Sequence, residues 1–422
     1  MKLFRRILIL FTVLILCYIT VKLLKGTGRT IASHRHVESI EDAGISLDEM
    51  AIPSDVRVVG LGEAACGSAE FQAAKLEVLK KMIADGGCRA ITFDIPVGEG
   101  AMINSAIHGN GAHLTELVSE LGRPYYDTQQ IIDLLAWMRE FNKGRSYDNS
   151  VMFYGIDMQD AYSSIKYLCE FGEVHPEAFK EGELEKITLL AEAGSDTDLT
   201  GEKEFFQNLY DHLSRSTNTD YMIASLAANS VLQSLVSFYM DEEQYIEYRS
   251  ACLALNVQTV SGIEEHRGYS RILVTAHNSE IAKSAPESDT HTTMGQRIND
   301  LYAGNYFAIG TEFYNAVVNV HIAGTYDEAY ERKDHRFCSL DILAYQASLF
   351  EDGKYVLVFD DVTEEQSKLY KIIHEENFVG VVPDEYSVSV DLRKSYRLNI
   401  KATDSYDAMI YYYETSPIKC LH

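Results

Sequence analysis

The sequence has 422 residues, of which 46% are hydrophobic, and this composition is enough to bury the core of one or two domains. Lysine and arginine number 37 and aspartate and glutamate 63, so the net charge of −26 excludes a nucleic-acid-binding role by repulsion. The same charge would attract a cationic ligand, although solubility alone also explains it.

The chain opens with a basic and then apolar segment that predicts a membrane anchor. Three basic residues precede an apolar stretch over residues 7–24. As a helix rising about 1.5 Å per residue, this stretch would span roughly 27 Å, just enough to cross a bilayer. No small-residue cleavage site follows, so we expect a retained transmembrane signal anchor over residues 7–25 rather than a cleaved signal peptide.

The charges around this segment predict its orientation. The positive-inside rule places residues 1–6 in the cytoplasm and the acidic bulk of the chain outside, as a single-pass protein of the cell membrane. We expect a stem over residues 26–50 and a folded domain over residues 51–422.

The first part of this domain has the pattern of a strand, a helix and a second strand. VRVVGL (residues 56–61) and CRAITFDI (88–95) are short apolar runs typical of strands. Between them, residues 71–85 have apolar side chains at helical spacing and end at Gly86, a helix stop. This order predicts a right-handed crossover between two parallel strands.

Strand and helix patterns continue to alternate along the rest of the chain. Residues 160–267 are mostly helical and are predicted as a helical subdomain. We therefore assign the fold to the α/β class: a mainly parallel sheet flanked by helices, with a large helical insertion. The other expected elements are a helix over 128–142 and strands over 150–157, 270–277, 305–313, 354–361, 377–382 and 406–414.

Four of the expected strands end in a polar side chain. These residues are Glu63, Asp94, Asp157 and His277. Sites in parallel sheets form beyond the carboxyl ends of the strands, so we expect the four side chains to share a cleft. Each of them taken alone would more often be a cap or a structural hydrogen-bond partner.

Several of these segments carry motifs that follow one another in a fixed order. They are LGEAACGSAEF, LLAWMREFN, FYGIDMQ, YRSACLALN, AHNSEIA, MGQRI and YDAMIYYYETSP. From about residue 55 to the C-terminus, this order resembles the erythromycin esterase family. The residues that carry the resemblance include Leu61, Gly62, Glu63, Ala64, Gly67, Glu70, Phe71, Trp137, Arg139, Asn142, Arg249, Asn256, His277 and Asn278.

The resemblance implies an enzyme that opens the lactone ring of fourteen-membered macrolides with water and without a metal or other cofactor. It implies a cleft between the α/β core and the helical part, with a first-motif histidine as the general base. This sequence departs from that pattern at three positions. Cys66 stands where the base histidine belongs, Glu280 replaces a second histidine, and Asp94 replaces the usual glutamate.

Cys66 leaves three interpretations open. A thiol is a poor base for activating water, so the chain could be an inactive relative that binds a ligand outside the cytoplasm. Alternatively, His277, Glu63 or Glu280 takes over as the base and hydrolysis survives. In the third interpretation, Cys66 is a nucleophile partnered by His277. The nearby carboxylate of Glu63 argues against that role because it raises the pKa of a thiol.

We favour an erythromycin esterase-like hydrolase that acts on a small-molecule carboxylic ester or lactone, with an inactive binding protein as the alternative. The candidate catalytic residues are Glu63, Cys66, Asp94, His277 and Glu280. The candidate substrate-binding residues are Lys75, Asp157, Arg249, Asn256 and Asn278. Lys75 would instead lie on a solvated helix face, and Arg249 or Asn256 would instead bond to Asp157. Asp360 and Asp361 are interpreted as a solvated turn rather than a metal site.

Overall fold

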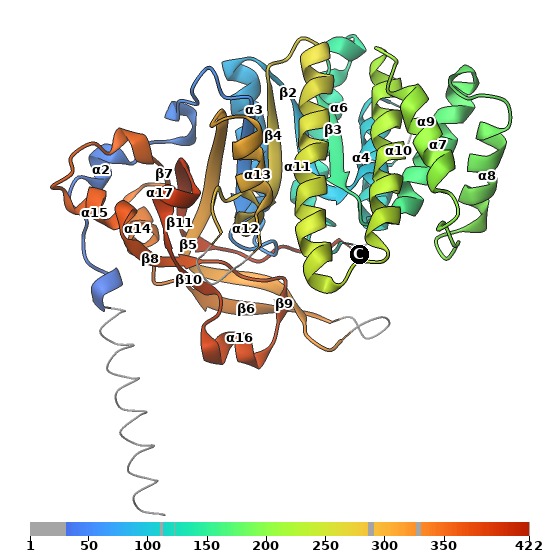
Figure 1. Cartoon of the computed structure of the whole chain (residues 1–422). Coiled ribbons are helices and arrows are strands. Elements are labelled where there is room, and N and C mark those ends of the chain that lie inside the picture. Colours follow the sequence, from blue (N-terminus) through green and yellow to red (C-terminus); the bar gives the residue numbers. More distant parts are fainter. Residues whose placement is uncertain (1–30, 110–112, 122, 286–290, 326–330, 422) are drawn as a thin grey trace, which may run out of the picture.

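A mainly parallel sheet lies at the centre of the protein, whose computed structural model describes residues 31–109, 113–121, 123–285, 291–325 and 331–421. The main path of the sheet has the order β3-β2-β4-β1-β5-β11-β7. All neighbours on this path are parallel except β11 and β7, which are antiparallel. The predicted α/β class, with a mostly parallel sheet flanked by helices, is therefore confirmed (Figure 1).

The elements have the following bounds. The strands are β1 (Val58–Glu63), β2 (Cys88–Pro96), β3 (Met152–Asp157), β4 (Arg271–His277), β5 (Tyr306–Ile322), β6 (Arg332–Cys338), β7 (Lys354–Val358), β8 (Glu376–Gly380), β9 (Glu385–Tyr386), β10 (Arg397–Lys401) and β11 (Ala408–Thr415). The helices are α2 (Ile40–Ala43), α3 (Ala69–Asp85), α4 (Val97–Ile107), α5 (Leu114–Glu120), α6 (Gln129–Asn142), α7 (Ala161–Val174), α8 (Glu183–Ala193), α9 (Lys203–Leu213), α10 (Thr219–Ser237), α11 (Glu242–His266), α12 (Asn278–Ile281), α13 (Met294–Leu301), α14 (Ile342–Gln346), α15 (Lys368–His374), α16 (Val388–Arg393) and α17 (Ala402–Ser405).

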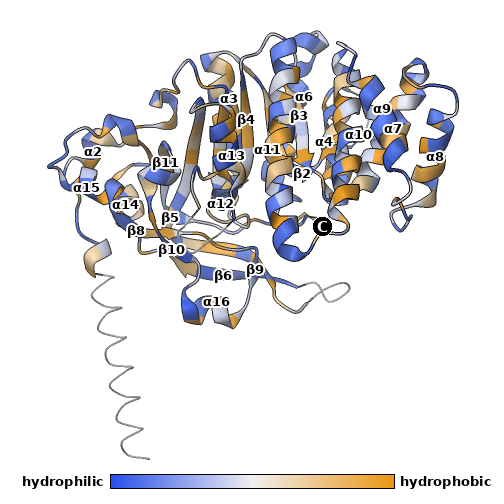
Figure 2. Cartoon of the chain, viewed as in Figure 1, coloured by the Kyte–Doolittle hydropathy of each residue, from blue (hydrophilic) through white to orange (hydrophobic). Residues whose placement is uncertain are grey.

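The two faces of the sheet are covered by two separate hydrophobic cores. Successive side chains of a strand point to opposite faces, so Val58 belongs to one core and Val59 to the other. Helices α11 and α13 pack into the first core, and α3 and α6 into the second. This double cover explains why the central strands are continuous apolar runs rather than alternating ones (Figure 2).

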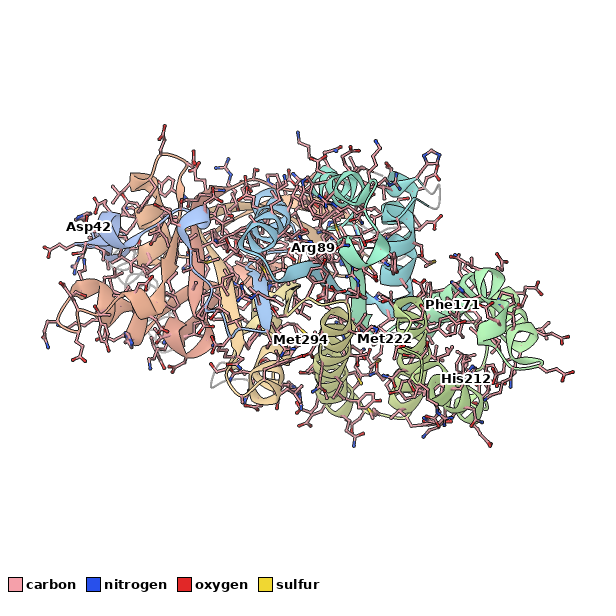
Figure 3. The ribbon with its side chains drawn as sticks, turned by 90° about the horizontal axis from the view of Figure 1, so that it is seen from above. Asp42, Arg89, Phe171, His212, Met222 and Met294 are labelled. Carbon is pink, nitrogen blue, oxygen red and sulfur yellow. The ribbon has the colours of Figure 1, made fainter. Side chains whose placement is uncertain are left out.

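Helices α7 to α11 occupy the region that was predicted as a helical subdomain. Helices α7 to α10 extend the molecule beyond β3, with Phe171 and His212 towards this end and Asp42 at the other (Figure 3). Helix α11, by contrast, packs directly on β2, β3 and β4. The last helix of the predicted insertion is therefore part of the layer that covers the sheet.

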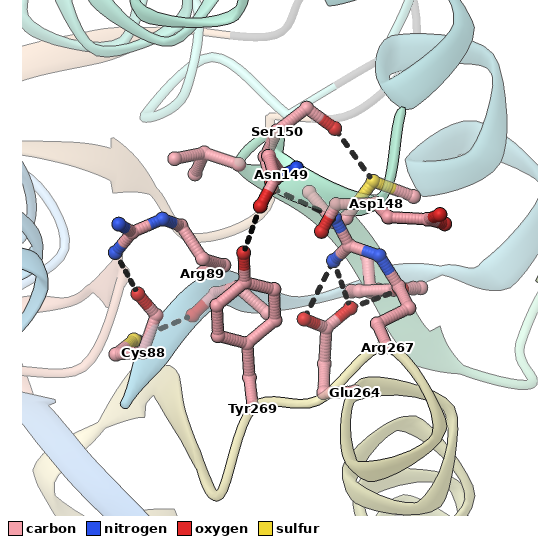
Figure 4. A network of polar contacts seen from close by, with 12 residues as sticks. Cys88, Arg89, Asp148, Asn149, Ser150, Glu264, Arg267 and Tyr269 are labelled. Carbon is pink, nitrogen blue, oxygen red and sulfur yellow. Dashed lines mark hydrogen bonds and ion pairs between the residues drawn. The ribbon is translucent and has the colours of Figure 1, made fainter. Parts of the chain in front are cut away.

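A buried ion pair fastens the end of α11 to the start of β3 (Figure 4). The side chains of Glu264 and Arg267 are both fully buried, and their closest charged atoms lie 2.6 Å apart. Arg267 also donates to the backbone carbonyls of Tyr147 and Ser150, at 2.9 and 2.8 Å. The Tyr154 hydroxyl donates to Glu264 at 2.6 Å. Because breaking such a pair leaves an uncompensated buried charge, this network holds the helical layer against the sheet.

The C-terminal part of the chain builds a second lobe at one end of the sheet. β5 continues past the parallel sheet and pairs with β6 and β9. β8, predicted from residues 377–382, pairs antiparallel with β10 in a separate two-stranded sheet. The strand predicted over 406–414 is confirmed as β11. Asp360 and Asp361 are exposed in a single 3-10 turn, Phe359–Asp361.

The start of the described chain differs from the predicted stem. Val37, Ile40 and Met50 are buried, and Ile45 forms a β-bridge with Val356. Val37 and Ile40 belong to one hydrophobic core and Met50 to the other, so this segment packs on the body of the protein. The anchor predicted over residues 7–25 lies outside the described residues. Within the described part of the chain, every helix is too short or too polar to cross a bilayer.

The contact between α4 and β3 gives a test of this packing. An added Cβ at Gly100 would lie 1.8 Å from the backbone nitrogen of Gly155, whereas one at Gly262, on the exposed surface of α11, meets nothing within 4 Å. We expect Gly100→Ala to lower the free energy of unfolding by about 1–3 kcal/mol. The matched change Gly262→Ala should raise it by about 0.5–1 kcal/mol. Urea unfolding measures both, and equal effects would contradict the close packing of α4 on β3.

Candidate active site

The parallel register brings the four polar strand ends to one edge of the sheet. Glu63 of β1 is paired with His277 of β4, the strand beside it. β2 lies on the other side of β4 and carries Asp94, and β3 follows with Asp157. The strand-end side chains predicted to meet thus occupy four neighbouring strands at their carboxyl ends.

Glu63 is held in a buried network with two residues of α3. Its carboxylate is 2.6 Å from the ammonium of Lys75, and it accepts a second bond of 2.6 Å from the side-chain amide of Gln72. The same amide donates to the backbone carbonyl of Cys66 at 2.7 Å. Burial raises the pKa of Glu63, and Lys75 opposes this shift. Both carboxylate oxygens are therefore occupied, and the network fixes the turn that carries Cys66.

Lys75 does not lie on a solvated helix face, contrary to one of the two interpretations made for it, but is buried beneath the site. Its side chain is fully buried. Its ammonium lies 5.0 Å from the ring centre of Phe93 and 4.8 Å from that of Tyr126. It also donates to the Gln72 side chain at 2.5 Å. A lysine placed in this way is a buried counterion of Glu63, stabilised further by two aromatic faces.

Asp94 is half-buried and accepts a short bond of 2.6 Å from the Tyr126 hydroxyl. Burial raises the pKa of Tyr126 far above its usual range, and the charges of Asp94 and Glu63 add to the shift. The phenol therefore stays a hydrogen-bond donor at any physiological pH. Asp94 is thereby oriented by a residue that lies 32 positions along the chain.

Cys66 is partly exposed, in the turn between β1 and α3, and its thiol is free. Burial raises the pKa of this thiol well above its ordinary value, and the carboxylates of Glu63, Asp384 and Asp94 raise it further. The reactive form of a cysteine is the thiolate, which these charges disfavour. The structure thus places the thiol where it stays protonated.

His277 is half-buried and neutral. Burial lowers its pKa, against the opposing effect of a bond to the Val382 carbonyl and of the charges of Asp94 and Asp384. Its Nδ1 lies 2.8 Å from the Ser279 hydroxyl, and its Nε2 lies 3.3 Å from the Val382 carbonyl oxygen. A carbonyl only accepts, so Nε2 carries the proton. Nδ1 is the unprotonated nitrogen, and its lone pair accepts from the backbone N–H of Ser279 at 3.5 Å as the N-cap of α12.

The third group of charged residues lies beside β3. Arg249 of α11 binds both oxygens of the fully buried Asp157, with the closest contact at 2.7 Å. This ion pair is the alternative that the sequence left open for Arg249. Burial raises the pKa of the half-buried Glu280, and the charge of Arg249 opposes that effect. Arg249 therefore acts on two carboxyl groups. It forms an ion pair with Asp157, and its positive charge favours the ionised form of Glu280.

Two predicted substrate-binding residues are structural instead. Asn256 is fully buried and bonds to the Ile156 carbonyl and to the side chain of Gln233. Asn278 is fully buried and exchanges two bonds with the backbone of Thr311. Polar residues that match a motif are misleading here because the backbone of neighbouring strands also needs hydrogen-bond partners.

Sequence reasoning missed Gln72, Tyr126, Val382 and Asp384. Gln72 stands three residues before Lys75, so helical spacing offered a signal for that pair. Val382 and Asp384 come from a segment far beyond Cys66 in the chain, and the sequence contains no signal for their approach. A β-bridge between Ala65 and Val382 brings that segment to the site.

Comparisons with known proteins agree with this architecture. The family model described as erythromycin esterase matches residues 83–415. An erythromycin esterase type II of Escherichia coli is 24% identical over 321 residues, which cover 66% of this chain and 73% of that protein. A crystal structure of a Bacillus cereus protein has a TM-score of 0.71 at 14% identity, covering 93% of this chain and 99% of the other. A mutant of the erythromycin esterase EreC in its open conformation has a TM-score of 0.59 at 16% identity, covering 87% and 93%.

The Glu63–Lys75 pair predicts a large loss of stability when one partner is removed. Lys75→Met leaves Glu63 buried without a counterion and should lower the free energy of unfolding by about 3–5 kcal/mol. The double change Glu63→Gln with Lys75→Met should recover most of that loss, because no charge then remains buried. Denaturant unfolding of the two single variants and the double variant measures the coupling.

The matched control is Lys81→Met on the same helix. Lys81 pairs with Asp85, whose side chain is 39% exposed, so the loss should be only about 1 kcal/mol or less. Equal losses at positions 75 and 81 would contradict the assignment of Lys75 as a buried counterion.

Proposed function

The chain belongs to the erythromycin esterase family, and on that premise we propose that it hydrolyses a carboxylic ester or lactone of a small molecule. The observation that carries the proposal is the neutral, half-buried imidazole of His277 at the strand edge, next to the fixed carboxylate of Glu63. An imidazole that is unprotonated at one nitrogen at neutral pH is suited to activating water.

His277 acts as the base in this proposal. Nδ1 of His277 accepts a proton from water after the exposed hydroxyl of Ser279 and the long N-cap bond of 3.5 Å from the Ser279 backbone N–H have given way to that water. The water oxygen attacks the carbonyl carbon, and the bond to the leaving oxygen then breaks. The proton on Nδ1 passes to that leaving oxygen, so His277 ends in its neutral form. Glu63 and Lys75 take no part in proton transfer and position the turn between β1 and α3.

In this scheme Cys66 stays protonated, so its side chain lines the site without a charge and does not react. A nucleophilic role requires the thiolate, which burial and three carboxylates disfavour. The same observation supports a second candidate function. Because Cys66 replaces the base histidine of the first motif, the chain would bind a ligand outside the cytoplasm without hydrolysing it. The two candidates differ in whether His277 replaces the base that the family carries in the first motif.

We further propose that the chain is anchored in the cell membrane through residues 7–25, with residues 31–422 outside the cytoplasm. The apolar length of that segment and the basic residues before it support this location. The substrate would then be an ester or lactone that is present outside the cytoplasm, a class that includes the macrolides.

Turnover of a panel of activated esters, lactones and macrolides tests the role of His277. We expect His277→Ala to lower kcat/KM by at least about 100-fold, the usual contribution of a positioned base. Cys66→Ala should retain activity within about threefold, because the thiol is not ionised. Circular dichroism of each variant controls for folding.

Two other outcomes would decide against this scheme. Loss of all activity in Cys66→Ala would make the thiol a participant in the reaction. A wild-type chain without turnover, combined with hydrolysis by Cys66→His alone, would establish the binding protein as the native function.

The pH dependence gives a second test. Burial lowers the pKa of His277, so its neutral form persists below the usual value of about 6.5 and is lost only in more acidic solution. We expect kcat/KM to be constant near pH 7 and to fall on acidification, with an apparent pKa below about 6.5. A rate that stays constant down to about pH 4, or an acidic limb well above about 6.5, would exclude His277 as the base.

A further inference from the structure

Glu312 is a fully buried carboxyl group in β5 that the proposed reaction does not use. The register of β1 with β5 pairs Leu61 with Ile309, so Glu312 lies level with the end of β1, beside the candidate site. One of its carboxylate oxygens accepts from the backbone N–H of Phe313 at 2.9 Å, and the other accepts from the backbone N–H of Gly380 at 2.7 Å. Glu312 therefore joins the main sheet to the last residue of β8.

The contact between Glu312 and β8 requires a glycine at position 380. A Cβ added to Gly380 would lie 2.6 Å from the ring of Phe313 and 2.9 Å from a carboxylate oxygen of Glu312. A side chain at this position would push the end of β8 away from β5. The absence of a side chain thus allows the backbone to approach the carboxylate closely.

Val382 lies midway between two anchored residues of the segment that follows β8. The N–H of Gly380, two positions earlier, is bound by Glu312 of β5. The carboxylate of Asp384, two positions later, is bound by Arg332 of β6 at 2.6 Å. The Val382 carbonyl is therefore held on both sides by side chains of other strands.

The residue before Glu312 fixes a third contact of Val382. The Thr311 hydroxyl accepts from the backbone N–H of Ala64 at 2.9 Å. The carbonyl of Ala64 in turn accepts from the backbone N–H of Val382 at 2.7 Å. Two consecutive residues of β5 thus set the position of Val382 relative to the turn between β1 and α3.

We propose that Glu312 is a positioning residue of the site: through Gly380 it holds the Val382 carbonyl against Nε2 of His277. The Nε2–Val382 contact is 3.3 Å long, so a small displacement of the segment breaks it. This contact keeps the proton of the neutral ring on Nε2 and leaves Nδ1 unprotonated. The effect of Glu312 on turnover rests on the proposed function, whereas its effect on the tautomer of His277 does not.

Glu312 acts on His277 by position rather than by charge. The charges that act on His277 are those of Asp94 and Asp384. Both oxygens of a carboxyl group retain a lone pair whether or not the group is protonated, so Glu312 accepts its two backbone bonds in either state. Loss of the acceptor, and not loss of the charge, is therefore the change that would move Val382.

Nitrogen-15 NMR of the imidazole groups in the full chain, kept in detergent micelles, tests this role. His277→Gln identifies the resonances of His277 by their loss. Glu312→Met removes both acceptor oxygens at a similar side-chain length. We expect it to raise the ratio of the Nδ1–H tautomer of His277 to the Nε2–H tautomer at least about threefold, as loss of one hydrogen bond predicts. Because the Val382 carbonyl also favours the protonated ring, the pKa of His277 should fall.

Asp341→Asn is the matched control. Asp341 is also buried, caps α14 by accepting from the backbone of Leu343 and Ala344, and places its charge near Glu312. Its replacement changes that charge but leaves the bond to Gly380 in place, so the tautomer ratio of His277 should remain that of the wild type. Equal shifts in the two variants overturn the proposal. A folded Glu312→Met chain with the wild-type tautomer ratio also overturns it.

Gly380→Ala weakens the same bond from the opposite side and replaces Glu312→Met if that variant does not fold. The added methyl group displaces the end of β8 from Glu312, so the tautomer ratio of His277 should shift in the same direction. A wild-type ratio in a folded Gly380→Ala chain would count against the role of Glu312.

The ester and lactone assay separates this inference from the proposed function. Glu312→Met should lower kcat about tenfold and leave KM within about twofold, because it displaces the base without touching the substrate. A tautomer shift in a chain without any turnover would refute the hydrolase and support the positioning role. Turnover that depends on His277, together with an unchanged tautomer in Glu312→Met, would refute the positioning role alone.

Discussion

The buried ion pair between Glu63 and Lys75 is the interaction on which the candidate site depends. It joins the end of β1 to α3 in the absence of solvent, with charged atoms 2.6 Å apart. Such a pair tolerates the loss of neither partner, because the remaining charge would stay buried. Gln72 extends the pair to the backbone of Cys66, so the same interaction fixes the turn at the mouth of the site. Phe93 and Tyr126 enclose the ammonium and connect the pair to β2 and Asp94.

This arrangement separates the acidic groups of the site by role. Lys75 neutralises Glu63, Tyr126 orients Asp94, and Arg249 binds Asp157, so each carboxylate has its own partner. The remaining negative charge acts on Cys66 and His277 from a distance. It raises the pKa of the thiol together with burial, whereas it only opposes the lowering that burial imposes on the imidazole. Burial therefore disfavours the charged form of both groups, the thiolate of Cys66 and the imidazolium of His277, and the negative charge adds to this effect only at the thiol.

The site is completed by a segment from the far end of the chain. β5 extends beyond the sheet, pairs with β6 and β9, and so carries the lobe that includes Val382 and Asp384. The backbone nitrogen of Val382 donates to the Ala64 carbonyl, and the Val382 carbonyl oxygen accepts a hydrogen bond from Nε2 of His277. Arg332 of β6 binds Asp384 and holds this segment in place. The position of this lobe therefore influences which nitrogen of His277 carries the proton, because the lobe supplies the Val382 carbonyl.

The sequence by itself determined the α/β class, the parallel strands and the polar residues at their carboxyl ends. It could do so because apolar runs, helical spacing and strand-end residues are local patterns that survive without tertiary contacts. It also carried the resemblance to the family, through motifs that lie within single segments. The motifs did not reveal that the side chains of Asn256 and Asn278 are buried and bonded inside the protein, and no pattern around Lys75 revealed its burial.

Only the tertiary structure decided the roles of these side chains, because burial and hydrogen-bond partners depend on contacts between distant segments. It placed Val382 and Asp384 beside Cys66 and His277, a proximity for which the sequence has no local pattern. It also decided that residues 37–50 pack on the body, because Ile45 meets Val356 from the far part of the chain. The protonation states of the Cys66 thiol and the His277 imidazole follow from the same contacts, since the pKa of a group is set by its burial and by the charges around it.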